Sequence, residues 1–290
     1  MKKKLGFAAG LIVVILISIF AFQLHSSAIK SKKEAAAVEK KVDTKQTKVS
    51  TNNKTNVNKN DEKAKNATSD VNNTPSVKQK VIVVDPGHAN KSNLEKEPIS
   101  PGSAEMKIKD GGGAEGVVTK TPEYSVNMKV SMKLKALLEK EGYIVKMTKT
   151  EDSQSLGNVE RAEIGNKENA DLVIRIHADS SDSSSANGAS MLVPEPINEN
   201  TKSINEKSMY YGKTVLNTLV SEVGMNNRGV VQRNDMTGFN WSKVPVILIE
   251  MGFLSNPQED QLLCSDDYEN KLAQGLAHGI DAAVKASSKK

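Results

Sequence analysis

Apolar residues occur in two patterns that alternate along this chain from residue 81 to its end. Short continuous apolar runs predict strands that are buried on both faces of a sheet. These runs cover residues 81–84, 143–147, 172–176, 190–193 and 246–249. Apolar residues spaced three and four apart predict helices with one buried face, over residues 122–141, 159–169, 201–222 and 266–286. This alternation predicts a single α/β domain with a mixed, largely parallel sheet flanked by helices.

The predicted helix over residues 122–141 has signals at both ends. Thr121 stands at the N-cap position and Pro122 at the first helical position, where these residue types are favoured. Gly142 follows the last turn and is expected to end the helix. The apolar stripe consists of Val126, Val130, Leu134, Leu137 and Leu138.

The N-terminal region has a different pattern. Lys2, Lys3 and Lys4 precede residues 5–24, which contain no charged residue. As a helix with a rise of about 1.5 Å per residue, this stretch would span roughly 30 Å, the thickness of a bilayer core. Residues 1–24 are therefore predicted to be a membrane anchor or signal segment. The length favours an uncleaved anchor, because cleavable signals have apolar cores of about 7–15 residues. Lysines flank both ends of the stretch, so charge alone leaves its orientation open.

Residues 25–79 are rich in Lys, Asn, Thr, Ser and Ala and contain no aromatic residue. Such a composition buries too little apolar area to offset the entropy lost on ordering, so a disordered linker is predicted. The folded domain is then expected to cover residues 80–290.

The charge of the chain is divided unevenly. The 290 residues carry a formal net charge of +5, but residues 1–80 contribute +10 and residues 81–290 contribute −5. A nucleic-acid-binding surface on the C-terminal part is excluded by this balance, because phosphate contacts need a positive face. Cys264 is the single cysteine, which excludes an internal disulfide framework.

Three polar residues at the ends of apolar strands are candidates for chemistry. His88 follows VIVVDPG, His177 closes LVIRIH, and Glu250 ends the run PVILI. Groups at the carboxyl ends of strands line the ligand crevice of open α/β sheets, so two imidazoles there can converge on one metal ion. A single such histidine is more often structural, and Glu250 has the alternative of pairing with a backbone amide or arginine. A carboxylate on an apolar strand costs free energy unless it is paired or functional.

Several motifs carry a resemblance to a known family. The stretches DPGH (85–88), RIHAD (175–179) and PVILIEMGFLSN (245–256) resemble the signature of the zinc-dependent N-acetylmuramoyl-L-alanine amidases, the amidase-3 family. Residues 122–148 and 158–178 are also similar to that family, in the same order. The resemblance covers nearly all of residues 81–286 and implies an α/β peptidoglycan hydrolase.

The resemblance also implies roles for particular residues. His88, Glu123 and His177 match the family's zinc ligands, and Glu250 matches its catalytic carboxylate. Glu123 has an alternative reading, since an acidic residue in the first turn of a helix interacts favourably with the helix dipole. The implied reaction cleaves the amide bond between N-acetylmuramic acid and L-alanine with a zinc-activated water. The substrate, peptidoglycan, then places the domain on the cell-wall side of a bacterial membrane, or outside the cell if the N-terminal segment is cleaved.

The region between the first two implied ligands departs from the family pattern. Thirty-four residues separate His88 from Glu123, and the insert is expected to be a loop over the site. It contains rival carboxylate ligands at Glu95, Glu97, Glu105 and Glu115.

Two further residues are open to alternative interpretations. Asp85 either orients His88, as carboxylates beside metal ligands do, or forms the turn before Pro86. Arg228, in the stretch 226–235, is expected to be a solvated loop charge, with contact to a substrate carboxylate as the alternative.

Three functions compete with the amidase reading. They are a different zinc amidase or peptidase acting on wall peptides, a wall-binding module without catalysis, and an anchored scaffold whose linker is the working part. The sequence does not predict an oligomeric state.

Overall fold

The apolar runs of the sequence form strands of one six-stranded sheet in the computed structural model, which describes residues 79–287. The strands are β1 (Val81–Pro86), β4 (Ile144–Met147), β5 (Leu172–Asp179), β6 (Ala189–Pro194), β7 (Asn227–Arg233) and β8 (Val246–Phe253). Their order across the sheet is β4-β1-β5-β8-β6-β7, and all neighbours are parallel except β6 and β8. The predicted mixed, largely parallel sheet is confirmed.

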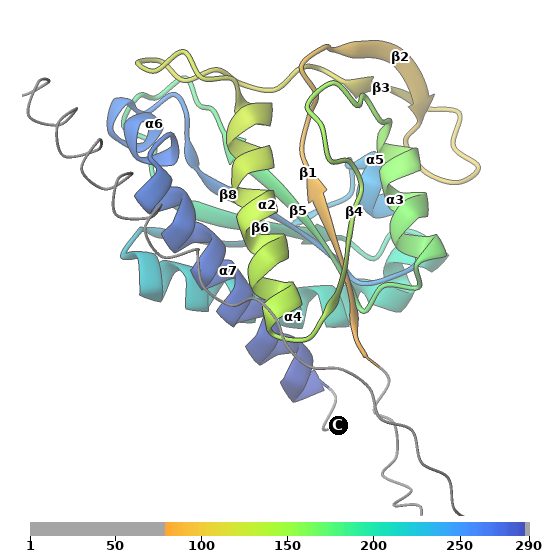
Figure 1. The fold of residues 1–290 in the computed structure, drawn as a ribbon. Helices are drawn as coiled ribbons and strands as arrows, with labels where there is room; N and C mark the ends of the chain where they lie inside the picture. The colour runs from red at the N-terminus through yellow and green to blue at the C-terminus, as the bar shows by residue number, and fades with distance from the viewer. Residues whose placement is uncertain (1–78, 288–290) are drawn as a thin grey trace, which may run out of the picture. The chain divides into compact units, whose positions relative to one another are not determined.

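The sheet is flanked by helices (Figure 1). They are α2 (Glu123–Lys140), α3 (Asn158–Lys167), α4 (Glu199–Val223), α5 (Thr237–Asn240), α6 (Pro257–Leu263) and α7 (Asp266–Ser287). Helices α2 and α7 pack together on one face of the sheet, and α4 packs along α7 and β6. Helix α3 and the short α5 contribute to the opposite face. The four long helices correspond to the four predicted amphipathic stretches.

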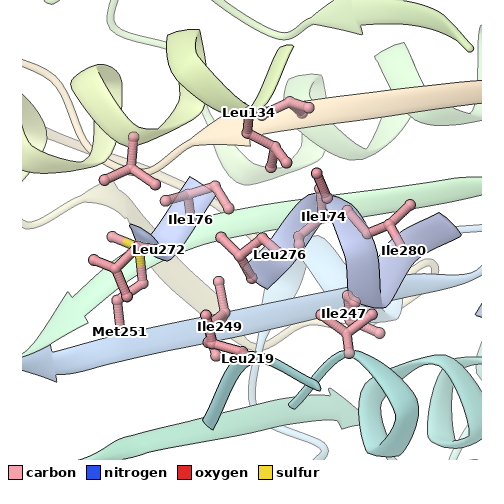
Figure 2. Close-up of a cluster of buried hydrophobic side chains, with 14 of the residues drawn as sticks. Leu134, Ile174, Ile176, Leu219, Ile247, Ile249, Met251, Leu272, Leu276 and Ile280 are labelled. Carbon is pink, nitrogen blue, oxygen red and sulfur yellow. The ribbon is translucent and has the colours of Figure 1, made fainter. Parts of the chain in front are cut away.

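The main core lies between the sheet and the α2, α4 and α7 layer. Figure 2 shows side chains from β5, β8 and these three helices meeting there. Ile174, Ile249 and Leu276 are fully buried in this cluster. A smaller cluster on the other face contains Val83, Phe239 and neighbours from β5 and β8. Because the central strands are buried on both faces, their sequences are continuous apolar runs.

The insert between β1 and α2 contains a β-hairpin. Strands β2 (Asn93–Pro98) and β3 (Met106–Asp110) pair antiparallel and form a separate two-stranded sheet. The insert was expected to be a loop over the site; part of it forms this hairpin instead, and residues of β3 line the cavity beside His88 and His177. The sequence NLEKEP of β2 has no apolar run. Since such a run is the pattern that predicts a buried strand, β2 could not be predicted from it.

Two local predictions also need correction. Thr121 is not the N-cap of α2, because that position is occupied by Pro122, which has extended backbone angles and makes no side-chain cap. Arg228 does not lie in a loop but in β7, an edge strand that pairs only with β6 among residues 79–287. The sequence NRGVVQR of β7 is mostly polar and partly exposed, so it lacks the apolar run that predicts a buried strand.

The predicted anchor or signal segment, residues 1–24, and all but the last residue of the predicted linker lie outside the described residues. Within residues 79–287, none of the helices combines the length and the apolar character needed to cross a bilayer. The domain boundary near residue 80 stays a prediction.

Candidate metal centre

The four implied site residues lie near the carboxyl ends of three neighbouring strands. His88 follows β1 by two residues, His177 is in β5, and Glu250 is in β8 directly opposite His177 in the parallel register. Glu123 is the first residue of α2. Pairing of β1 with β5 and of β5 with β8 brings these distant positions together.

His88, Glu123 and His177 converge on one point. Each offers a ligand atom, and the three atoms lie within 4.8 Å of one another. The Glu123 carboxylate lies between the two imidazoles: its Oε2 is 3.4 Å from His88 Nε2 and its Oε1 is 3.1 Å from His177 Nδ1. The ring centroids of the histidines are 4.9 Å apart, with planes at 83°. No other group of three or more potential metal ligands of this kind occurs in residues 79–287.

The backbone around these residues is shaped to allow close approach. His88 has a φ of 60°, which is unusual for a residue with a side chain and is often found at functional sites. A Cβ atom on Gly87 would lie 2.2 Å from Cε1 of His177, and one on Gly113 would lie 2.8 Å from Oε2 of Glu123. Both positions therefore need glycine for the ligand side chains to meet.

The electrostatics of the cluster place Glu123 and His177 in the protonation states of metal ligands, whereas His88 has to lose a proton before it can bind a metal. Burial opposes ionisation of Glu123, but hydrogen bonds to His177 and His88 outweigh it and hold its pKa well below the usual value. Burial lowers the pKa of His177 to about 4, so its imidazole is neutral at neutral pH. Burial also opposes charge on His88, yet hydrogen bonds to Asp110 and Glu123 raise its pKa to about 9. An ionised carboxylate and a neutral imidazole are the ligand forms that metals require.

The donor set fits a divalent metal ion of the zinc type. Two imidazoles and one carboxylate, with a fourth position for water or substrate, are typical of catalytic zinc sites. His177 Nε2 is buried and has no hydrogen-bond partner in the described part of the chain. A buried polar atom without a partner costs free energy, and such a cost is expected at a functional site.

Glu250 lies beside this cluster. Its Oε2 atom is buried and has no hydrogen-bond partner within residues 79–287. Burial raises the pKa of Glu250 well above its usual value, and the negative charges of Glu123 and Asp179 add to the effect. A carboxyl group with a raised pKa is suited to accept and release a proton near neutral pH.

Asp85 does not orient His88, contrary to one reading of the sequence. Its carboxylate accepts hydrogen bonds from Arg161 Nη1 at 2.6 Å, Arg175 Nε at 2.8 Å and Thr148 Oγ1 at 2.5 Å. The two guanidinium groups, together with Thr148, overcome the effect of burial and lower the pKa of Asp85. Asp85 is therefore the centre of a buried ion pair beneath the site.

The residue that contacts the free side of the His88 ring is Asp110, whose Oδ1 lies 2.7 Å from His88 Nδ1. Asp110 was not predicted to be a site residue. It lies in the insert, 22 residues after His88, and only the fold of the hairpin brings it to the ring. The sole local signal is an aspartate followed by three glycines, which is ambiguous.

The rival carboxylates of the insert do not join the cluster. Glu95 pairs with Lys109 at 3.0 Å, and Glu97 accepts backbone N–H groups of Asn158 and Val159 at the start of α3. Glu105 and Glu115 are not among the grouped ligands either. The guanidinium of Arg228 lies over the ring of Phe253, 4.7 Å from the centroid.

A cavity of about 290 Å³ opens beside the cluster, under the hairpin. Its walls include His88, His177, Glu250, Ile108, Arg175 and Met236. The hairpin strand β3 thus forms part of the wall of the space next to the candidate metal ligands.

The fold and these side chains define an α/β domain with a potential His–Glu–His metal site at the carboxyl ends of its parallel strands. A sequence profile described as N-acetylmuramoyl-L-alanine amidase, amidase-3, matches residues 82–282. The chain belongs to this family.

Individual relatives agree with this assignment. A probable cell wall amidase, LytH, from Staphylococcus saprophyticus is 29% identical over 210 residues, which cover 72% of this chain and 60% of that protein. The chain thus spans about 60% of the length of this curated relative. Among solved structures, the N-acetylmuramoyl-L-alanine amidase from Clostridium difficile 630 is 26% identical with a TM-score of 0.59, covering 72% of this chain and 98% of that one. Ami1 from Mycobacterium abscessus is 25% identical with a TM-score of 0.65, covering 71% and 98%.

Proposed function

We propose that this chain hydrolyses peptidoglycan at the amide bond between N-acetylmuramic acid and the L-alanine of the stem peptide. The observation that carries the proposal is the convergence of His88, Glu123 and His177 within 4.8 Å, with Glu250 beside His177 on the neighbouring strand. Membership of the amidase family supports the choice of bond.

His88, Glu123 and His177 would hold a zinc ion. Zinc, when bound, supplies a Lewis acid that polarises a carbonyl and lowers the pKa of a coordinated water toward about 7. The three protein ligands leave a position open for water and substrate, as catalytic zinc sites do. His177 is neutral and Glu123 ionised, so neither has to lose a proton to act as a ligand.

Glu250 would act as the general base and then as the general acid. Its carboxylate accepts a proton from the attacking water, and the resulting carboxyl group donates it to the amine of the departing L-alanine. The raised pKa of Glu250 brings its proton affinity closer to that of these groups. Its neighbour Arg175 stays bound to Asp85 and is assigned no role in proton transfer.

The proposed place of action is the cell wall. The relative LytH is named a probable cell wall amidase. If residues 5–24 form the predicted membrane anchor, they would keep the domain near its polymeric substrate. Under this proposal the anchor contacts the membrane, the catalytic domain faces the wall, and nucleic acid is not a partner.

The test is analysis of the products released from purified peptidoglycan. The proposal predicts stem peptides with a free L-alanine amine, and loss of this product after chelation. Glu250→Gln should lower the rate by about 10²–10⁴-fold, the usual contribution of a general acid–base group, while bound zinc is retained. Glu163→Gln is the matched control, because Glu163 is exposed on α3 and its charge change should leave the rate unaltered.

The competing functions give different results in the same assay. New amines elsewhere in the stem peptide would indicate a different peptidase. Binding to peptidoglycan with no released product, and no effect of chelation, would indicate a wall-binding module. Either result would overturn the proposed amidase activity.

A further inference from the structure

Asp110 is the last residue of β3 and lies against the candidate metal site. Its side chain is buried, with a relative exposure of 4%. Oδ1 lies 2.7 Å from His88 Nδ1 and also accepts the backbone N–H of Gly112 at 2.9 Å. Oδ2 is buried without a hydrogen-bond partner in the described part of the chain. The contact with His88 is therefore the main interaction of this carboxylate with the site.

The two nitrogens of the His88 ring face different groups. Nε2 faces the Glu123 carboxylate at 3.4 Å, and Nδ1 faces Asp110. An ionised carboxylate only accepts hydrogen bonds, so the ring must carry its proton on Nδ1 to bond with Asp110. To bind a metal the ring has to give up its other proton, and the lone pair of this neutral form is then on Nε2, which faces Glu123.

We propose that Asp110 is a positioning residue that fixes the tautomer and orientation of His88, and thereby makes the β2–β3 hairpin a part of the metal site. This inference rests on the proposed function, since it assumes that His88 binds zinc. A hydrogen bond from the second ring nitrogen to a carboxylate orients a metal-bound histidine and makes it a better donor.

The apolar side chains on the two strands of the hairpin are largely exposed. Leu94, Met106 and Ile108 are 69%, 46% and 44% exposed. The hairpin is attached to the rest of the domain through polar contacts instead, including the Glu97 carboxylate on the start of α3 and the indole N–H of Trp241 on the Pro98 carbonyl. Asp110 is the hairpin residue whose polar contact reaches a candidate ligand.

This arrangement couples two equilibria. A zinc ion held by His88 would polarise the ring and make its Nδ1–H a stronger donor to Asp110, which would stabilise the hairpin in this position. Because coupling between two binding events is reciprocal, the hairpin in this position must raise zinc affinity by the same factor. The insert thus takes part in metal binding through one side chain.

Zinc affinity, measured by competition with a chromophoric chelator, tests the proposal. Asp110→Ala should weaken zinc binding by about 10–100-fold, the usual effect of removing such a partner. Asp110→Asn keeps an oxygen acceptor for Nδ1–H and should restore part of the loss. Glu95→Gln, a change of equal charge on β2 at an exposed residue, should bind zinc like the wild type. Equal affinity in wild type and Asp110→Ala would overturn the proposal.

A second readout follows the hairpin instead of the metal. Zinc should slow amide hydrogen exchange in residues 106–110 of the wild-type protein and have little effect on them in Asp110→Ala. Equal slowing in both proteins would overturn the coupling. If thermal unfolding in chelator shows that the alanine variant does not fold, Asp110→Asn is measured instead, and zinc should slow exchange in its residues 106–110 less than in the wild type. A wild-type protein that binds no zinc would instead overturn the proposed metal site itself, so the two failures are distinguishable.

Discussion

Glu123 illustrates how little a single residue reveals before its neighbours are known. In the sequence it is an acidic residue at the start of a helix, which the helix dipole alone would explain at about 0.3–1 kcal/mol. In the structure its carboxylate contacts both histidines, the side-chain amide of Asn127 and the N–H groups of Ala114 and Ala178. A dipole explanation needs none of these contacts, whereas the contacts with the two histidines support the proposed ligand role.

Asp85 gives a prediction about stability at low pH. Its folded pKa is lowered by Arg161 and Arg175 against the effect of burial, so the unfolded chain takes up the proton first as pH falls. The stabilisation is complete above the unfolded aspartate pKa of about 3.9 and is lost as pH falls through the lower folded value. The free energy of unfolding, measured with urea, should therefore decrease as the pH falls below about 4.

The variant Asp85→Asn separates the contribution of Asp85 to acid unfolding from the contributions of other carboxyl groups. At neutral pH the variant should be less stable by about 3–5 kcal/mol, because two buried arginines lose their common partner. The difference in the free energy of unfolding between variant and wild type should become smaller as the pH falls from about 4 to 3. A gap that stays constant over this range would show that Asp85 does not titrate as described.

Elements with an apolar pattern are the ones that the sequence predicts. Strands β1, β5 and β8 are buried on both faces and have continuous apolar runs, so their existence and their parallel arrangement follow from the sequence. Strands β2, β3 and β7 were not predicted because their residues are mostly polar and partly exposed. Their pairing depends on neighbours that are distant in sequence, which local patterns do not contain.

The attachment of the hairpin to α3 gives a prediction for this element. Glu97 is 5% exposed, and its two carboxylate oxygens accept the N–H groups of Asn158 at 2.8 Å and Val159 at 3.1 Å. These are first-turn donors of α3, and its N-cap residue, Gly157, has no side chain that could accept them. Glu97→Ala should lower the free energy of unfolding by about 1–3 kcal/mol, since two N–H groups lose their acceptor.

Glu95 on the same strand is the control for this measurement. Its side chain is 76% exposed and pairs with Lys109 at the surface, so Glu95→Ala should change stability by no more than about 0.5 kcal/mol. Urea unfolding of both variants checks the prediction. Equal effects at the two positions would show that Glu97 does not cap α3.

At the scale of the whole molecule, the C-terminal helix α7 helps to fix the site. It packs on α2, whose first residue is Glu123, and on α4. Leu276 of α7 is fully buried in the main core, where Figure 2 shows it next to side chains of the sheet. Leu276→Ala should lower the free energy of unfolding by about 2–5 kcal/mol through lost burial and a cavity.

The matched control is another leucine at the surface. Leu262 in α6 is 44% exposed, and Leu262→Ala should cost no more than about 0.5 kcal/mol. Both values come from denaturant unfolding. Similar losses for the two variants would contradict the packing described for α7.

The fold class follows from the chain's alternating pattern, whereas the site follows only in part. The strand-end positions of His88, His177 and Glu250 predict that they lie at one edge of the sheet. The assignment of Glu123 needed the family resemblance, because four other glutamates lie between it and His88. Asp110 needed the structure, because the hairpin that positions it has no apolar signal.

The central claim is that His88, Glu123 and His177 hold one zinc ion beside Glu250. The most direct measurement is anomalous diffraction from crystals grown with zinc, using data on both sides of the zinc absorption edge. We predict one strong peak in this domain, about 2.0–2.2 Å from a ring nitrogen of each histidine and from a Glu123 oxygen. No peak at saturating zinc, or a peak bound by other residues, would contradict the account.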